Sequence, residues 1–266
     1  MNIYWHEIKA NSLALLWWVI GMLGLIGASM VKYAGYVAAG ESVNTLIANM
    51  PPMLQALTGA GRFDLSKASG FYGVMFLYIA LLAGIHATVL GATILAKEER
   101  DHTTEFLYVK PVSRSTIITS KLLAALTMVI VFNLVTFMTS TYFVNAFGQG
   151  EDASVFIRTL MAALFVIQLL FLAFGTATSA LMRKPAAAAG LASAVMLGTY
   201  ILSIAIDLYD KLEPLKYLTP FKYFEASTLK PPTGHLEAGY LLLSAGLVTV
   251  MVALVYHLYR RKDLMV

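Results

Sequence analysis

Six long stretches of the chain contain no Asp, Glu, Lys or Arg, and this feature limits the possible folds more than any other. They cover residues 13–31, 71–96, 122–147, 159–182, 186–206 and 238–259. About 20 apolar residues in a helix cross the ~30 Å hydrocarbon core of a bilayer. A helix also satisfies its own backbone hydrogen bonds, as lipid requires. The sequence therefore predicts an all-α polytopic membrane protein with six transmembrane helices.

The composition agrees with a chain that lies mostly in a membrane. Apolar residues make up 59% of the 266 residues and charged residues 13%, whereas soluble domains are about half apolar and about a quarter charged. A soluble globular fold is thereby excluded. Since the spans take up much of the length, we expect one transmembrane domain over residues 1–266, with no separate soluble catalytic domain.

The sequence lacks the residues that many enzymes and metal sites use. It contains no cysteine, its five histidines are scattered without a His-Glu-x-x-His pair, and no glycine is followed by lysine. Thiolate sites, helical zinc proteases and phosphate-binding P-loops are therefore excluded in this chain. The spans also offer no carboxylate and no pair of histidines to an intramembrane enzyme. We expect a non-catalytic chain with no catalytic residue, no metal, no cofactor of its own and no nucleic-acid partner.

The distribution of basic residues predicts the orientation in the membrane. With both termini in the cytoplasm, that side carries eleven Lys and Arg in about 47 residues, and the other side carries eight in about 79. Basic residues concentrate in cytoplasmic loops. We therefore expect a multi-pass protein of the cell membrane with both termini cytoplasmic.

Residues 1–12 precede the first span and are typical of a short interfacial helix. We expect Ile3, Trp5 and Ile8 against the membrane and Glu7 and Lys9 in water; a frayed tail is the alternative. The first apolar stretch exceeds the core of a signal peptide, which has about 7–15 residues. It is therefore expected to stay in the protein as a span.

The connection over residues 207–235 differs from a simple turn. It combines aromatic and charged residues with four prolines. Aromatic side chains at this density favour the level of the lipid headgroups. We expect short interfacial or re-entrant helices here, without an independent domain.

The cytoplasmic connection between the second and third spans, residues 97–121, is the most informative stretch. Its first part carries charges of both signs, and an apolar cluster follows before Pro111. This pattern favours an amphipathic helix whose apolar side enters a groove on a soluble partner. A solvated loop that only enforces the topology is the alternative, but it leaves the apolar cluster unexplained. The candidate docking residues are Glu98, Glu99, Arg100, Glu105, Phe106, Leu107, Val109 and Arg114.

The same connection carries a recognisable series of residues: Glu99, Thr103, Glu105, Leu107, Pro111, Val112, Ser113, Arg114 and Lys121. The series resembles that of the membrane permeases of ABC type-2 exporters, the group that contains the bacitracin-resistance and sodium-extrusion permeases. His102 stands where those permeases have a glycine. Residues 5–9, 175–184 and 218–224 add weaker similarity in the same order, so the resemblance covers nearly the whole chain.

The resemblance implies a mechanism and a set of partners. Residues 97–121 would form the coupling helix that docks on a cytoplasmic ABC ATPase subunit, which holds the ATP and Mg. Two permeases, either two copies or two related chains, would move a substrate out of a bacterial cell. We expect an amphipathic or hydrophobic substrate, such as a peptide, an antibiotic (as in multidrug export) or a lipid-like molecule. Sodium export occurs in the resembling family and stays open. An ion-gradient-driven secondary transporter is the alternative, although such carriers usually bury a charge at mid-membrane.

Polar residues inside the spans are the candidates for a substrate pathway. The resemblance implies that the second and fifth spans face the other permease of the dimer and line the substrate pathway. Side-chain hydrogen bonds between packed helices are the alternative role for each of these residues. The candidates are His86, Thr88, Asn133, Ser193, Thr199 and Ser203.

Overall fold

The computed structural model describes residues 3–38, 44–45, 49–51, 53–55, 62–100, 112–182, 185–231 and 234–261. Within these ranges every regular element is a helix. The main elements are α1 (Ile3–Ala38), α4 (Ala68–Arg100), α6 (Arg114–Phe147), α7 (Ser154–Leu181), α8 (Pro185–Leu208), the 3₁₀ helix η2 (Asp210–Leu218), α9 (Pro220–Tyr223) and α10 (Ala238–Arg261).

Six helices in the described residues are long and apolar enough to cross a membrane, namely α1, α4, α6, α7, α8 and α10. The predicted all-α polytopic fold is therefore confirmed. Several helices are longer than the uncharged stretches that predicted them. α1 has 36 residues and spans about 54 Å at 1.5 Å per residue, against ~40–45 Å for a bilayer with its headgroups. The difference arises because a charged residue ends an uncharged stretch but does not end a helix.

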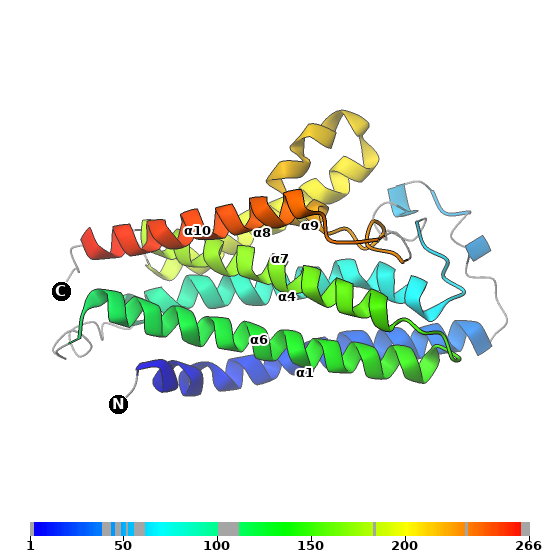
Figure 1. Cartoon of the computed structure of the whole chain (residues 1–266), viewed down its shortest axis with the longest axis horizontal. Helices are drawn as coiled ribbons and strands as arrows, with labels where there is room; N and C mark the ends of the chain where they lie inside the picture. Colours follow the sequence, from blue (N-terminus) through cyan, green and yellow to red (C-terminus); the bar gives the residue numbers. More distant parts are fainter. Residues whose placement is uncertain are drawn as a thin grey trace.

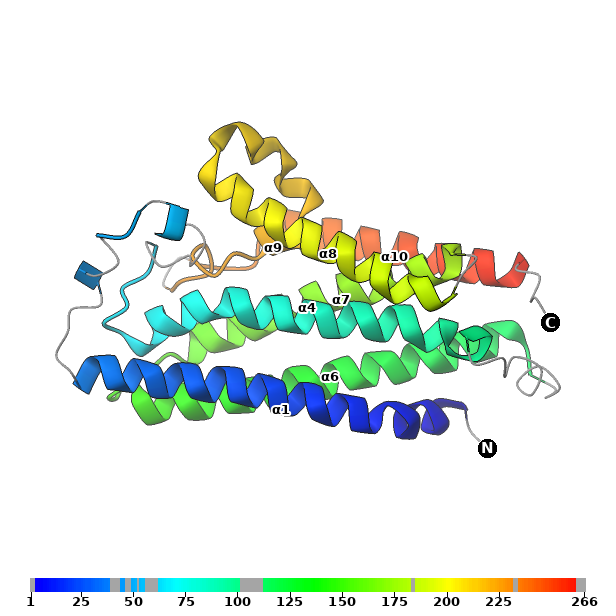
Figure 2. The same cartoon turned by 180° about the vertical axis from the view of Figure 1, so that it is seen from behind.

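The six long helices form an elongated bundle (Figures 1 and 2). α1 begins and α10 ends at the same end of the bundle, which we call the terminal end. α4 ends and α6 begins there as well (Figure 1). At the other end, which we call the opposite end, η2 stands away from the bundle and α9 leads back to it. These two elements confirm the short helices predicted within residues 207–235.

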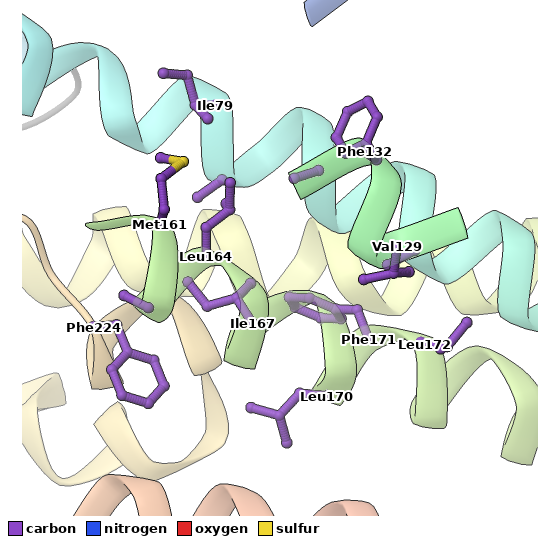
Figure 3. Close-up of a cluster of buried hydrophobic side chains, with 14 of the residues drawn as sticks. Ile79, Val129, Phe132, Met161, Leu164, Ile167, Leu170, Phe171, Leu172 and Phe224 are labelled. Carbon is purple, nitrogen blue, oxygen red and sulfur yellow. The ribbon is translucent and has the colours of Figure 1, made fainter. Parts of the chain in front are cut away.

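α7 lies at the centre of the bundle and packs against α4, α6, α8 and α10. Figure 3 shows its Leu164, Ile167 and Phe171 within a cluster that also contains Ile79 of α4 and Phe132 of α6. All five side chains are buried. Because lipid is as apolar as these side chains, van der Waals packing and interhelical hydrogen bonds, rather than the hydrophobic effect, hold the helices together.

Two glycines allow α4 and α7 to cross closely. A Cβ on Gly91 of α4 would lie 2.4 Å from the carbonyl oxygen of Leu172, and a Cβ on Gly175 of α7 would lie 2.4 Å from that of Thr88. Both distances are far below van der Waals contact. Neither position therefore accepts a side chain without moving the backbone of the neighbouring helix, a use of small residues that is common in membrane bundles.

Candidate coupling site at the terminal end

The structure describes the two ends of the predicted coupling connection but not its middle. Glu98, Glu99 and Arg100 form the last residues of α4, and the positions of their side chains lie outside the described residues. Arg114 is the first residue of α6. The predicted docking residues Glu105, Phe106, Leu107 and Val109 also fall outside the described residues.

A side-chain cap fixes the point where the connection enters α6. Ser113 has an extended backbone conformation, and its Oγ accepts a hydrogen bond from the backbone N–H of Thr116 at 3.1 Å. A serine in this position satisfies one of the N–H groups that the first turn leaves unpaired, and it contributes about 1 kcal/mol to helix stability. The first turn of α6 thus lies inside the predicted connection 97–121, and the helix begins before the predicted start of the third span at Leu122.

A buried ion pair lies seven residues into α6. The Nζ of Lys121 is 3.3 Å from the Oε1 of Glu7 on α1, and the two side chains are 1% and 2% exposed. Lys121 also donates a 2.6 Å hydrogen bond to the carbonyl oxygen of Ile94 near the end of α4. Asn11 donates to the carboxylate of Glu7 at 3.4 Å. One lysine therefore connects α6 with α1 and α4.

This pair corrects the expectation that Glu7 lies in water. The helix that was predicted for residues 1–12 continues without a break into the first span as α1. Glu7 faces the bundle, whereas Lys9, two residues further on, is exposed. The prediction of water around Glu7 was wrong because its partner is 114 residues away in the sequence, on α6.

A second set of contacts joins α10 to the same region. Arg114 donates a long, 3.4 Å hydrogen bond to the carbonyl oxygen of Tyr259. The hydroxyl of Tyr259 donates to the carbonyl oxygen of Leu95 on α4 at 3.3 Å. The hydroxyls of Thr119 and Tyr256 are 2.7 Å apart. α10 thus contacts both the end of α4 and the beginning of α6.

These contacts make the terminal end a mechanical junction. The end of α4 and the beginning of α6 are attached to α1 through Lys121 and to α10 through Arg114 and Tyr259. A displacement of the connection would therefore act on four helices together. In the described part of the chain, no group of His, Asp and Glu side chains has the arrangement of a metal site.

The sequence matches the family model described as "ABC-2 family transporter protein" over residues 1–264. The chain belongs to the ABC-2 transporter family. The resemblance to ABC type-2 permeases is thus confirmed at the level of the family. A search of curated proteins finds no match.

Membership of the ABC-2 family describes the chain as a membrane component of a transporter, a class that is generally non-catalytic. The family also implies association with an ATPase subunit. Together with the six apolar helices, it supports a multi-pass membrane protein.

The predicted pathway residues of this ABC-2 chain do not meet in one place. His86 is 3% exposed and stacks on Phe132 of α6, with ring centroids 4.5 Å apart. Thr88 lies at the crossing of α4 with α7. Asn133 donates a 3.0 Å hydrogen bond to the side-chain oxygen of Gln168 on α7. These three residues face different neighbours inside the chain.

The three predicted residues on α8 also have different surroundings. Ser193 and Thr199 are partly exposed on the side of the bundle, and Thr199 donates to the carbonyl oxygen of Met196 within its own helix at 2.7 Å. Ser203 is buried and donates to the carbonyl oxygen of Tyr200 at 2.7 Å. Ser203 also lines a cavity at the opposite end.

Proposed function

We propose that this chain is the permease subunit of an ATP-driven ABC exporter that moves an amphipathic or hydrophobic substrate, such as a peptide, an antibiotic or a lipid-like molecule, out of the cell. The terminal end lies in the cytoplasm, as the excess of basic residues on that side suggests. The observation that carries the proposal is the junction around Lys121, which ties α6 to α1 and α4 beside the candidate coupling connection.

The junction supports coupling because a force that a soluble partner exerts on the connection would be transmitted to several helices. ATP binding changes the shape of the ATPase, and the permease responds only if that movement reaches several spans. Residues 97–121 provide the contact, and the ties to α1, α4 and α10 carry the movement into the membrane. Exposed ion pairs contribute only about 0–1 kcal/mol each. The apolar Phe106, Leu107 and Val109 therefore supply most of the docking energy.

A second permease, identical or related, packs against α8 in this proposal. Gly190, Ala194 and Gly198 recur every four residues and lie on one exposed side of that helix. Apart from the adjacent residues and the backbone of α8 itself, no atom of the described residues lies within 4 Å of the place where a Cβ would stand on either glycine. Small residues at this spacing let two helices approach closely in lipid. Ser193 and Thr199, on the same helix, would then border the space between the two permeases.

The test of the proposal is a triple variant, Glu105→Lys, Phe106→Ala and Leu107→Ala, purified together with the partner ATPase. At about 0.8 kcal/mol for each buried CH₂, the two truncations weaken docking by several kcal/mol, and the charge reversal removes a favourable pairing. We expect loss of co-purification and of substrate-stimulated ATP hydrolysis, while the variant still inserts in the membrane.

Glu213→Lys on η2, at the opposite end, is the matched control for the charge reversal, and it should leave ATP hydrolysis unchanged. Wild-type co-purification and wild-type stimulation in the triple variant would show that the connection only enforces the topology. That result would favour the ion-gradient alternative.

A further inference from the structure

A cavity of about 280 Å³ lies at the opposite end of the chain, between α4, α7, α8 and α9. Its deep part is formed by Leu77 and Ala80 of α4, Ile167 of α7 and Ser203 of α8, with Phe221 of α9 beside them. The volume is near the lower limit for small-molecule sites, which is about 300 Å³. A cavity of this size, with an apolar deep part, has room for a segment of hydrocarbon chain.

The depth of the cavity follows from the positions of its residues along the helices. Gly73 and Ala80 both line it and are seven residues apart on α4, which corresponds to about 10 Å along the helix axis. Ser203 lies one helical turn deeper than Asp207 on α8. Ile167 and the lining residue Phe224 belong to the buried cluster of Figure 3. The cavity therefore extends from the end of the bundle into its apolar interior.

Four charged residues that line the outer part of the cavity contact one another in a closed ring of alternating sign. The Nη2 of Arg62 is 2.6 Å from the Oδ1 of Asp207, which is 2.5 Å from the Nζ of Lys222. Lys222 is 3.1 Å from the Oε2 of Glu225, and Glu225 contacts Arg62 again. All four side chains line the cavity. We call them the charged ring.

The charged ring has no net charge but a strong local separation of charge. Its side chains are 46% (Arg62), 19% (Asp207), 10% (Lys222) and 26% (Glu225) exposed. Burial lowers the pKa of the Lys222 ammonium, although Asp207 acts in the opposite direction. The ring is thus partly desolvated, and its ion pairs are stronger than pairs in open water.

We propose that this cavity binds a zwitterionic amphiphile, with one hydrocarbon chain in the apolar part and the headgroup on the charged ring. The anionic group of such a headgroup meets Arg62 and Lys222, and its cationic group meets Asp207 and Glu225. A neutral ring of two bases and two acids matches a zwitterion better than a headgroup of a single charge, because a zwitterion engages both the bases and the acids, whereas a singly charged headgroup leaves one of the two pairs unengaged. The uncharged stretch of α8 ends at Asp207, which places the ring at the level of the lipid headgroups.

The occupant is either a bilayer phospholipid or a free single-chain amphiphile, which share this chemistry. The proposal does not depend on the proposed export function, since binding is measured on the chain without nucleotide. The probes are phosphatidylcholine, phosphatidylglycerol and lysophosphatidylcholine, each with a photoreactive diazirine in the middle of one acyl chain. The full chain is reconstituted in vesicles that contain one probe at a time, illuminated, and mapped by mass spectrometry.

We expect zwitterionic probes to label the peptides that contain residues 73–80 and 203–207. The anionic probe should label them about tenfold less, the effect of losing one charge-assisted contact. Labelling by phosphatidylcholine alone identifies a bilayer lipid as the occupant, and labelling by lysophosphatidylcholine alone identifies a free amphiphile. Absence of both, or labelling spread evenly over the lipid-facing helices, would overturn the proposal.

Variants of the cavity and of the ring separate binding from folding. Ala80→Phe on α4, or Ser203→Leu on α8, should fill the cavity and reduce labelling by the zwitterionic probes about tenfold. Asp207→Asn with Glu225→Gln leaves a doubly positive ring, and the ratio of anionic to zwitterionic labelling should then invert. Lys216→Gln is the matched control, because Lys216 pairs with Glu213 outside the ring at 2.9 Å. An unchanged ratio in the double variant, in protein that inserts normally, would contradict the role of the ring.

Discussion

Loss of either partner of the Glu7–Lys121 pair should destabilise the protein strongly. Both side chains are almost completely buried, and their charged atoms are 3.3 Å apart. Removal of one partner leaves the other charge buried and uncompensated, which costs about 3–5 kcal/mol. We therefore expect Lys121→Met and Glu7→Met each to lower the free energy of unfolding by about that amount.

The double variant Glu7→Met with Lys121→Met should behave differently. Replacement of a buried ion pair by apolar side chains of similar size is often neutral or even stabilising. The carbonyl oxygen of Ile94 loses its bond from Lys121, and Asn11 retains its 2.9 Å bond to the backbone oxygen of Glu7. We expect the double variant to be clearly more stable than either single variant, so the two effects are strongly non-additive.

The free energies are measured by reversible unfolding in mixed micelles with increasing sodium dodecyl sulfate. Lys9→Met is the matched control, because Lys9 is an exposed lysine on the same helix, and it should change stability by less than about 0.5 kcal/mol. If the single variants of Glu7 and Lys121 lose no more unfolding free energy than Lys9→Met does, water reaches the pair. The junction would then lose its main physical support.

Two further predictions concern orientation and packing. In intact cells, a membrane-impermeant thiol reagent should label Ser227→Cys but not Ser113→Cys, and the reverse pattern would show that the terminal end is outside. Gly91→Leu and Gly175→Leu should each lower thermal stability markedly, since their side chains would overlap backbone atoms at 2.4 Å and overpacking costs about 1–3 kcal/mol or more. Gly24→Leu is the control, as a Cβ on Gly24 meets no other described element within 4 Å. Gly91→Leu and Gly175→Leu variants that are as stable as Gly24→Leu would refute the close crossing of α4 and α7.

The spans could be predicted from the sequence because the rule behind them is local. Lipid admits a backbone only when it satisfies its own hydrogen bonds, and a charge-free apolar stretch of sufficient length marks such a helix. The same rule predicts the ends of the helices less accurately. α1 continues to Ala38, beyond the predicted boundary at Val31, because Lys32 can remain helical while its charge reaches the interface.

The junction at the terminal end could not be predicted because its contacts are distant in the sequence. A lysine directly before an apolar span, such as Lys121, is usually an interfacial charge that sets the topology. Glu7 has the spacing of a residue on the polar side of an interfacial helix. Only the packing of α1 against α6 turns the two into a buried pair. A weak signal existed, since Lys121 belongs to the series of residues shared with the ABC type-2 permeases.

The charged ring was missed for the same reason. In the sequence, Asp207, Lys222 and Glu225 are charges within an aromatic connection, and Arg62 belongs to a different connection. Their proximity depends on α9 returning to the bundle beside α4 and α8. The docking residues of the coupling connection stay predictions, because Glu105, Phe106, Leu107 and Val109 lie outside the described residues.

Measuring efflux from vesicles that contain the chain and its ATPase partner tests which source of energy drives transport. A fluorescent amphipathic peptide is loaded inside right-side-out proteoliposomes together with ATP, and ionophores collapse every ion gradient. We predict that efflux continues under these conditions, stops when ATP is omitted, and is absent with the chain alone, which has no P-loop. Efflux that needs an ion gradient and proceeds without ATP or the ATPase would contradict the proposed mechanism.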